Sequence, residues 1–254
     1  MKTNFILTLL TYLVLMSCST KKNILYVQDI DQTNPTELHF ETPTIQAYDI
    51  LKITVSTLDP SAAIPYNKAT ANVSSATNLE LMRLEGYEVS KDLKIQFPQL
   101  GILLVKNLTT SQLADTITQR LESEGHLINP VVNVRLLNAK FTILGEVTRP
   151  GTYNFTESKL TLLQAIGLAG DLTINGKRNN IKLVREINQK RIVSHIDLTS
   201  SDWMTSSSYY IYSNDVIIID PNAPKVTSAR FVGNVGTAVT VVSVLLSTII
   251  LLTR

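Results

Sequence analysis

The stretch Ile50-Leu51-Lys52-Ile53-Thr54-Val55 alternates apolar and polar side chains along its whole length. Alternation with a period of two is typical of a strand that buries one face and exposes the other. The segment after it, residues 58–78, is rich in Ala, Ser, Asn and Pro and is predicted to be a long loop. The folded part of the chain therefore opens with a half-buried strand.

Three further strands and one helix complete a first unit. The strands are predicted at residues 93–97, 102–105 and 131–137. A helix is predicted from a cap at Thr109-Thr110-Ser111 to Leu121, because Leu113, Ile117 and Leu121 fall on one face. The order of strands, helix and strand predicts a small α/β sandwich of the α+β class over residues 41–138.

A second unit follows with almost no linker, over residues 139–222. Its strands are predicted at residues 141–147, 152–155, 180–184, 191–196 and 216–219. Arg149-Pro150-Gly151 marks the first turn, and a short apolar helix over 160–168 has Thr161 as a candidate cap and Gly170 as a stop. This succession predicts a β-grasp fold.

The N-terminus carries a membrane signal. Residues 5–16 form an apolar run behind Lys2 and end at Leu15-Met16-Ser17-Cys18, which resembles the lipobox of bacterial lipoproteins. The interpretation is a signal peptide over 1–17, lipidation of Cys18 and a tether over 18–40; an uncleaved signal anchor is the alternative. Cys18 is the only cysteine, so a disulfide within the chain is excluded. The absence of an acidic residue just after it favours the periplasmic leaflet of the outer membrane.

The C-terminus carries a second membrane signal. Residues 231–253 contain no charged side chain and stop at Arg254, which predicts a membrane-crossing helix over 226–254. Small or polar residues recur along it at spacings of three and four and form one stripe: Gly233, Gly236, Thr240, Ser243 and Ser247. A stripe of this kind suits helix packing or a wet pore, whereas a plain single-span anchor is the simpler alternative.

Several classes of function are not supported by the residues. A formal net charge of +2 with scattered Lys and Arg does not favour nucleic acid as a partner. No phosphate-cradling glycine loop with its Lys is present, and His39, His126 and His195 stand far apart without metal-ligand spacing. We therefore predict no cofactor, no metal and no catalytic residue.

Two groups of residues leave a choice between structure and function. Asp49 is predicted to stabilise a turn between strands rather than to act as a functional carboxylate. The rings of Tyr209, Tyr210 and Tyr212 could stack on sugars, although packing within a strand is the favoured interpretation.

The motifs also resemble a known family. The run 45–55, with Asp49 in place and Tyr48 where the family usually has Gly, resembles the opening of the polysaccharide-export domain. The same pattern continues in order through residues 86–89, 95–101, 108–109 and 129–134. Residues 144–153, 161–166 and 169–171 resemble the soluble-ligand-binding β-grasp (SLBB) module found next to it. Each motif is weak alone, but their shared order is a strong signal.

This resemblance to Wza-like outer-membrane polysaccharide-export lipoproteins implies a non-enzymatic subunit of an oligomeric translocon. It implies a lipid-anchored periplasmic body, a homo-oligomeric ring whose terminal helices cross the outer membrane, and capsular polysaccharide or exopolysaccharide as the substrate. Inner-membrane co-polymerase or export machinery and membrane lipid are the other implied partners. Whether the small-residue stripe faces the pore or a neighbouring helix stays open.

Two rival functions remain. The first is a membrane-tethered carbohydrate-binding protein that forms no pore. The second is a periplasmic polysaccharide-modifying enzyme, which would need paired carboxylates at one sugar bond. The candidate carboxylates for that enzyme are Asp49, Glu85, Glu146 and Asp171.

Overall fold

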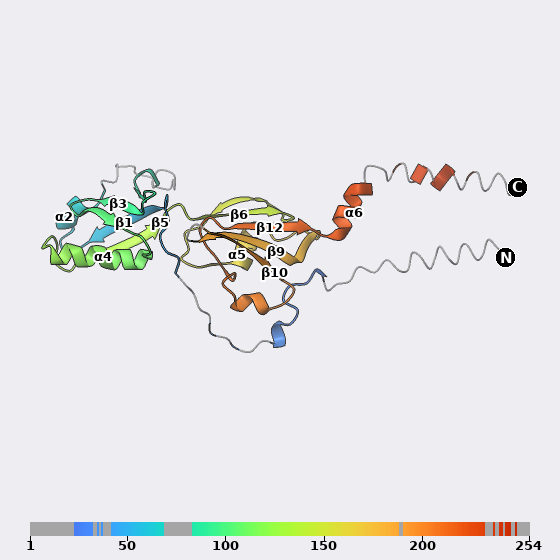
Figure 1. The fold of residues 1–254 in the computed structure, drawn as a ribbon, viewed down its shortest axis with the longest axis horizontal. Coiled ribbons are helices and arrows are strands. Elements are labelled where there is room, and N and C mark those ends of the chain that lie inside the picture. The colour runs from blue at the N-terminus through green and yellow to red at the C-terminus, as the bar shows by residue number, and fades with distance from the viewer. Residues whose placement is uncertain are drawn as a thin grey trace.

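A computed structural model describes residues 23–32, 35, 37, 42–68, 83–187 and 190–231, together with 236, 239, 240, 242–244 and 247. Two domains lie end to end along the longest axis of the molecule (Figure 1). The first domain covers residues 42–137 and the second covers residues 140–221. The predicted mixture of helices and strands in two successive domains is confirmed.

The first domain is built on an antiparallel sheet with the strand order β2-β1-β5. A two-stranded hairpin, β3-β4, and a long helix, α4, pack beside it. The bounds of these elements are β1 Ile50–Ser56, α2 Pro60–Ala63, η3 Ile64–Tyr66, β2 Tyr87–Glu88, β3 Lys94–Phe97, β4 Gly101–Leu104, α4 Thr110–Ser123 and β5 Val131–Leu136. The strands and the helix predicted from alternation and capping are therefore all present.

Helix α4 forms where the sequence places both a cap and an apolar stripe. Thr109 is the N-cap, and its hydroxyl and the Gln112 side chain form a reciprocal capping box. Leu113, Ile117 and Leu121 are fully buried and join the alternating apolar residues of β1 in one core. Burial of each such side chain contributes about 2 kcal/mol to folding.

The predicted loop over 58–78 is wrong in its first part. Residues Pro60–Ala63 form helix α2, and the carboxylate of Asp59 accepts a hydrogen bond from the backbone N–H of Ser61 at 2.9 Å. Pro60 lies at the first helical position, where no N–H is needed. An Asp-Pro pair followed by small residues therefore starts a helix here. Residues 69–82 lie outside the described part of the chain.

The second domain has a mixed five-stranded sheet with the order β10-β9-β12-β6-β7. Strand β12 runs parallel to β6 and antiparallel to β9, while β6 and β7 form a hairpin. The elements are β6 Lys140–Gly145, β7 Gly151–Asn154, β8 Leu160–Thr161, α5 Leu162–Leu168, β9 Gly176–Ile187, β10 Lys190–Ile196, η4 Asp202–Thr205, β11 Tyr210–Ile211, β12 Val216–Pro221 and α6 Ala223–Phe231. A hairpin, a crossing helix and a parallel central pair fit the predicted β-grasp.

Helix α5 begins and ends at the residues that the sequence indicated. Thr161 caps it through a box with Gln164. Gly170 has φ +78°, and Asp171 after it has φ +72°, so both residues turn the chain in the left-handed region. Leu162 and Ile166 are buried with the sheet residues of this domain.

A buried ion pair ties the loop before β12 to the sheet. The guanidinium of Arg185 donates to both carboxylate oxygens of Asp215, at 2.9 and 2.6 Å. It also donates to the backbone carbonyls of Ser207 and Tyr210. Removal of either charged partner would leave the other one buried and unpaired, at a cost of about 3–5 kcal/mol.

Part of the predicted N-terminal tether is packed onto the second domain. The backbone N–H groups of Val27 and Gln28 donate to the carbonyls of Leu198 and Thr199, both at 2.9 Å. The hydroxyl of Tyr26 donates to Asp171 Oδ1, and Val27 is buried. Residues 23–32, including the short helix η2 at Ile30–Gln32, are therefore part of the folded body. Residues 1–22, with Cys18, lie outside the described residues.

The C-terminal stripe falls only partly within the described residues. Gly236, Thr240, Ser243 and Ser247 are helical, whereas Gly233 lies outside. The three hydroxyls donate to the carbonyl oxygens four residues earlier, on Gly236, Val239 and Ser243. In the described part of the chain, no helix has the length and apolarity that a membrane crossing requires, so the predicted helix over 226–254 is not confirmed.

We expect Gly145→Ala to destabilise the second domain. Gly145 has φ +94°, and an added Cβ would lie 1.9 Å from the carbonyl oxygen of Ile219 on the paired strand β12. Backbone strain and displacement of β12 together should lower the free energy of unfolding by about 2–4 kcal/mol, measured by urea denaturation. Gly167→Ala in α5 is the control, because nothing lies within 4 Å of its added Cβ. It should stabilise the protein by about 0.5–1 kcal/mol; equal effects at the two glycines would contradict the expectation.

Candidate functional site: the cavity between the domains

The linker between the two domains is short and held in place. Leu137 and Ala139 are buried. Between them, the Asn138 side chain accepts from the N–H of Ile50 and donates to the carbonyl of Tyr48, both at 2.9 Å. These two bonds attach the linker to the start of β1. The linker is therefore fixed to the first domain by a side chain.

Arg83 provides a second link between the domains. Its Nη2 donates to Asn154 Oδ1 on β7 at 2.8 Å, and its Nε donates to the carbonyl of Leu137 at 3.2 Å. The guanidinium thus contacts the linker and the second domain at once. It is a direct side-chain contact between the first domain and the second.

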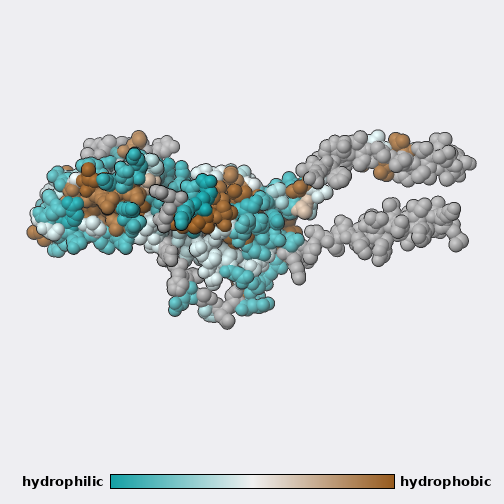
Figure 2. Space-filling model, in the orientation of Figure 1, coloured by the Kyte–Doolittle hydropathy of each residue, from teal (hydrophilic) through white to brown (hydrophobic). Residues whose placement is uncertain are grey.

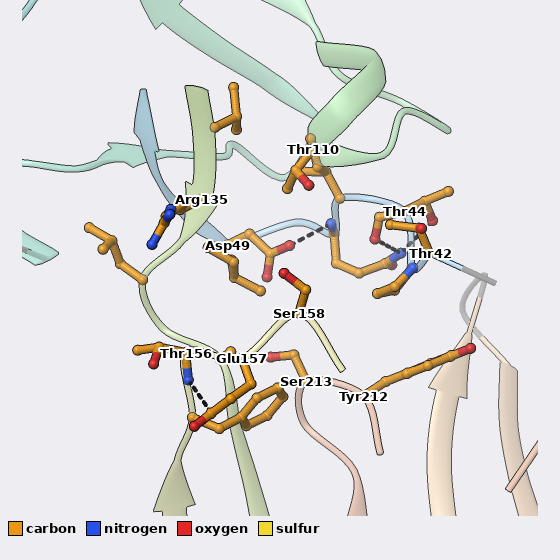
Figure 3. A pocket seen from close by; sticks show the side chains of 18 of the residues that line it. Thr42, Thr44, Asp49, Thr110, Arg135, Thr156, Glu157, Ser158, Tyr212 and Ser213 are labelled. Atoms are coloured by element: carbon orange, nitrogen blue, oxygen red, sulfur yellow. Dashed lines mark hydrogen bonds between the residues drawn. The ribbon is translucent and has the colours of Figure 1, made fainter. Parts of the chain in front are cut away.

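A cavity of about 1250 Å³ lies between the domains. Its walls are the outward face of β1 and β5, the segment 42–49, and the loops at 155–158 and 211–213 together with the end of β9. Figure 3 shows side chains from these segments pointing into the same space. Most ligand pockets measure roughly 300–1,000 Å³, so this one has room for an extended ligand.

Asp49 lies at the centre of this view, where the chain turns into β1 (Figure 3). Its Oδ2 accepts a hydrogen bond from the N–H of Gln46 at 2.8 Å, and the residue is 5% exposed. Burial raises the pKa of Asp49 to about 6, and the Gln46 N–H offsets part of that rise. The predicted turn-stabilising role is therefore confirmed, and the same carboxyl group also lines the cavity.

The residue before Asp49 adopts a backbone conformation that favours glycine. Tyr48 has φ +68°, a conformation that glycine adopts without strain, and its side chain is exposed. Its carbonyl accepts the bond from Asn138. The turn therefore keeps its shape although a tyrosine replaces the glycine.

The wall formed by β1 and β5 is polar and positively charged. Lys52 is the cross-strand neighbour of Arg135, and Thr54 is the neighbour of Asn133. All four side chains are exposed and line the cavity. Neither cation forms an ion pair with any of the residues described here.

The opposite wall supplies mainly hydroxyl groups. Thr156, Glu157, Ser158 and Ser213 come from two loops of the second domain (Figure 3). Glu157 Oε2 accepts a hydrogen bond from the N–H of Thr156 at 3.0 Å. Ser213 Oγ is shielded from solvent and has no hydrogen-bond partner within the described part of the chain.

The three candidate tyrosines do not all lie in the same environment. Tyr209 packs against the core of the second domain, with its ring 5.8 Å from that of Trp203 and 4.8 Å from that of Tyr210. Tyr212 lines the cavity, and its ring lies 4.0 Å from the Arg185 guanidinium carbon. The favoured packing interpretation is therefore confirmed for Tyr209, while Tyr212 lies where a ligand could reach it.

The other three candidate carboxylates lie outside the cavity that Asp49 lines. Glu146 accepts from the hydroxyl of Thr173 at 2.7 Å, and Asp171 accepts from Tyr26. Glu85 is half-exposed in the first domain, and none of these three lines the cavity. Among the described residues, the four carboxylates are not brought to one site.

The two described histidines make separate local contacts. His126 lies beside Tyr66 and Glu124, and His195 Nδ1 lies 2.7 Å from Asn180 Oδ1. His39 lies outside the described residues. Within the described ranges, no group of three His, Cys, Asp or Glu residues is arranged to hold a metal ion.

Sequence reasoning missed the paired cations. Alternation places Lys52 on the outward face of β1, and the same argument places Arg135 outward on β5. Nothing in either strand reveals that they are direct neighbours, because that depends on the register between segments about 80 residues apart in the chain.

Each of the two domains on either side of the cavity matches a known family model. Residues 41–137 match the family model described as polysaccharide biosynthesis/export protein, and residues 140–193 match that of the SLBB domain. The two matches cover more than half of the chain. The first domain therefore belongs to the polysaccharide biosynthesis/export family, and the second is an SLBB domain.

Two curated relatives carry the same name, EPS I polysaccharide export outer membrane protein EpsA. The protein from Ralstonia solanacearum is 26% identical over 140 residues, which are 54% of this chain and 36% of the relative. The protein from Ralstonia nicotianae is 31% identical over 106 residues, 40% of this chain and 27% of the relative. The chain thus matches about a third of each relative's length. The family and these names support the prediction that the chain is not an enzyme.

We expect Asp49→Asn to flatten the pH dependence of stability. The folded-state pKa, about 6, lies above the value of about 3.9 in an unfolded chain, so the folded state holds the proton more tightly. The contribution of Asp49 to the free energy of unfolding therefore falls as pH rises from about 4 to about 6. Asn keeps an oxygen for the Gln46 N–H but has no charge to bury. The difference in unfolding free energy between pH 4.5 and 7.5 should shrink by about 1–3 kcal/mol.

Urea denaturation at the two pH values measures this difference. Asp115→Asn, at an exposed position on α4, is the matched control and should leave the wild-type pH dependence in place. An unchanged pH dependence in Asp49→Asn would show that burial does not raise the pKa of the Asp49 carboxyl group.

Proposed function

We propose that this chain is an outer-membrane lipoprotein subunit of an oligomeric translocon that exports capsular polysaccharide or exopolysaccharide. The observation that carries the proposal is the pair of adjoining domains, a polysaccharide biosynthesis/export domain and an SLBB domain, in a chain similar to proteins named for polysaccharide export at the outer membrane. Inner-membrane co-polymerase or export machinery would supply the polymer and the driving force.

The positions of the chain's two membrane signals support this attachment. Residues 23–32 are held on the second domain, and helix α6 leaves the same domain directly after β12. Cys18 precedes the docked segment by only a few residues, so a lipid on it would hold the SLBB domain close to the bilayer. One acyl chain anchors weakly, and a second attachment through residues 226–254 would make the anchoring firm.

Exposed apolar surface supports self-association. Ile102 and Leu104 on β4 are 65% and 58% exposed, and Ile192 and Val193 on β10 are 49% and 50% exposed. Strand β10 is an edge of its sheet, with backbone groups available for pairing. Figure 2 shows brown apolar surface on both domains, set among hydrophilic side chains. We propose that such surfaces meet in a homo-oligomeric ring.

The stripe near the C-terminus supports helix packing within that ring. The hydroxyls of Thr240, Ser243 and Ser247 are satisfied by carbonyls of their own helix, so apolar surroundings would not leave them unpaired. Gly236 and the serines permit close approach of a neighbouring helix. A face of this kind would serve either a helix contact or a hydrated pore.

The cavity between the domains also suits the rival function of a tethered carbohydrate-binding protein without a pore. Particle size separates the two functions. Electron microscopy of the full chain, purified in mild detergent, should show rings if the translocon proposal is right. Monomeric particles that still bind polymer would favour the rival.

Within the translocon, Gly236→Leu and Ser243→Leu should weaken assembly. A leucine on the stripe blocks close approach of the helices, so the ring fraction in size-exclusion chromatography should fall several-fold and exported polymer should fall with it. Val242→Leu is the control, because it enlarges a side chain of the same helix away from the stripe. Equal effects of all three variants would contradict a role for the stripe.

A further inference from the structure

Two like charges face each other on the wall of the cavity between the domains. Lys52 on β1 and Arg135 on β5 are direct cross-strand neighbours, and both side chains are exposed to the cavity. Like charges at opposed positions of a sheet repel and lower its stability. No carboxylate among the described residues forms an ion pair with either of them. Two neighbouring cations without a carboxylate partner lower the stability of the fold. Such a pair therefore points to an anionic ligand that would neutralise it.

Neutral hydrogen-bonding groups surround these cations. Thr54 and Asn133 lie two residues along the same strands and face the same way. Thr156 and Ser158 come from the facing wall of the second domain, and both side chains are exposed. Hydroxyl and amide groups of this kind suit the many hydroxyls of a sugar, whereas a charged guanidinium and ammonium suit a carboxylate.

The remaining charges of the cavity limit what kind of anion fits. Arg185 is neutralised by Asp215, and Glu186 is paired with Arg191 at 2.6 Å. Glu157 and Asp49 line the cavity opposite or beside the cations, so a compact, highly charged anion would be repelled. A ligand with isolated carboxylates separated by hydroxyl-rich surface avoids this repulsion. Its carboxylate would lie against Lys52 and Arg135, and its hydroxyls against the other walls.

We propose that the cavity between the domains binds a segment of acidic polysaccharide, with a uronate-type carboxylate held between Lys52 and Arg135. The volume of about 1250 Å³ has room for several sugar residues. This inference rests on the proposed function, because it names the substrate class of the same export protein. The proposal places polymer-contacting residues on both domains. Binding therefore depends on the angle between the two domains.

The test is calorimetric titration of the full chain in detergent with a galacturonate hexamer, and with a neutral maltohexaose for comparison. The wild-type protein should bind the acidic hexamer at least about tenfold more tightly than the neutral one. Raising the salt concentration should weaken only the acidic binding. The double variant Lys52→Gln/Arg135→Gln should lose at least about tenfold in affinity for the acidic hexamer and keep its affinity for the neutral one.

The matched control is Lys94→Gln/Lys106→Gln, which removes two exposed charges from the same domain away from the cavity. Equal weakening by both double variants, or equal binding of the two hexamers by the wild type, would overturn the proposal. Absence of acidic binding in a chain that still restores export to a deletion strain would overturn this inference alone. Unchanged export in the deletion strain itself would overturn the proposed function.

Discussion

The arrangement of the two domains depends on how their short linker is held, and the amide side chain of Asn138 attaches that linker to the first domain. It accepts from the first N–H of β1, on Ile50, and donates to the carbonyl of Tyr48 two residues earlier, so the linker is attached to the sheet of the first domain. Leu137 and Ala139, on either side of Asn138, are buried. A hinge with satisfied backbone groups and buried neighbours has little freedom to open, because opening would expose apolar surface and break both bonds.

The cavity follows from the angle between the two domains. Each domain buries its apolar residues in a core of its own, and the face of β1 and β5 turned away from α4 is left polar. The domain angle places this polar face opposite the loops at 155–158 and 211–213. The Arg185–Asp215 pair holds the second of these loops against the sheet, because Asp215 also accepts from the N–H of Tyr212 and Arg185 donates to the carbonyl of Tyr210. The groups that face the cavity are therefore held by rigid elements on both sides, as pre-organised binding requires.

Much of the local structure could be predicted because it depends on neighbours in the chain. The capping boxes at Thr109 and Thr161 and the stop at Gly170 involve residues within a few positions of one another. The prediction of a loop over 58–78 was wrong at Asp59-Pro60, where a local cap starts a helix. Composition alone does not reveal that helix. The packing of residues 23–32 onto the second domain was also missed, because Val27 and Tyr26 find their partners more than 140 residues away.

The sequence by itself determined the two domain types, their order, the period of each strand and helix, and the turn-forming place of Asp49. These properties follow from side-chain periodicity and from short-range hydrogen bonds, which a linear pattern contains. Only the tertiary structure decided that Lys52 lies opposite Arg135, that Asn138 fixes the linker to the first domain, and that Ser213 and Asp49 line one cavity. The physical reason is that strand register and domain angle arise from contacts between distant segments, and periodicity indicates which face a side chain occupies but not what lies across from it.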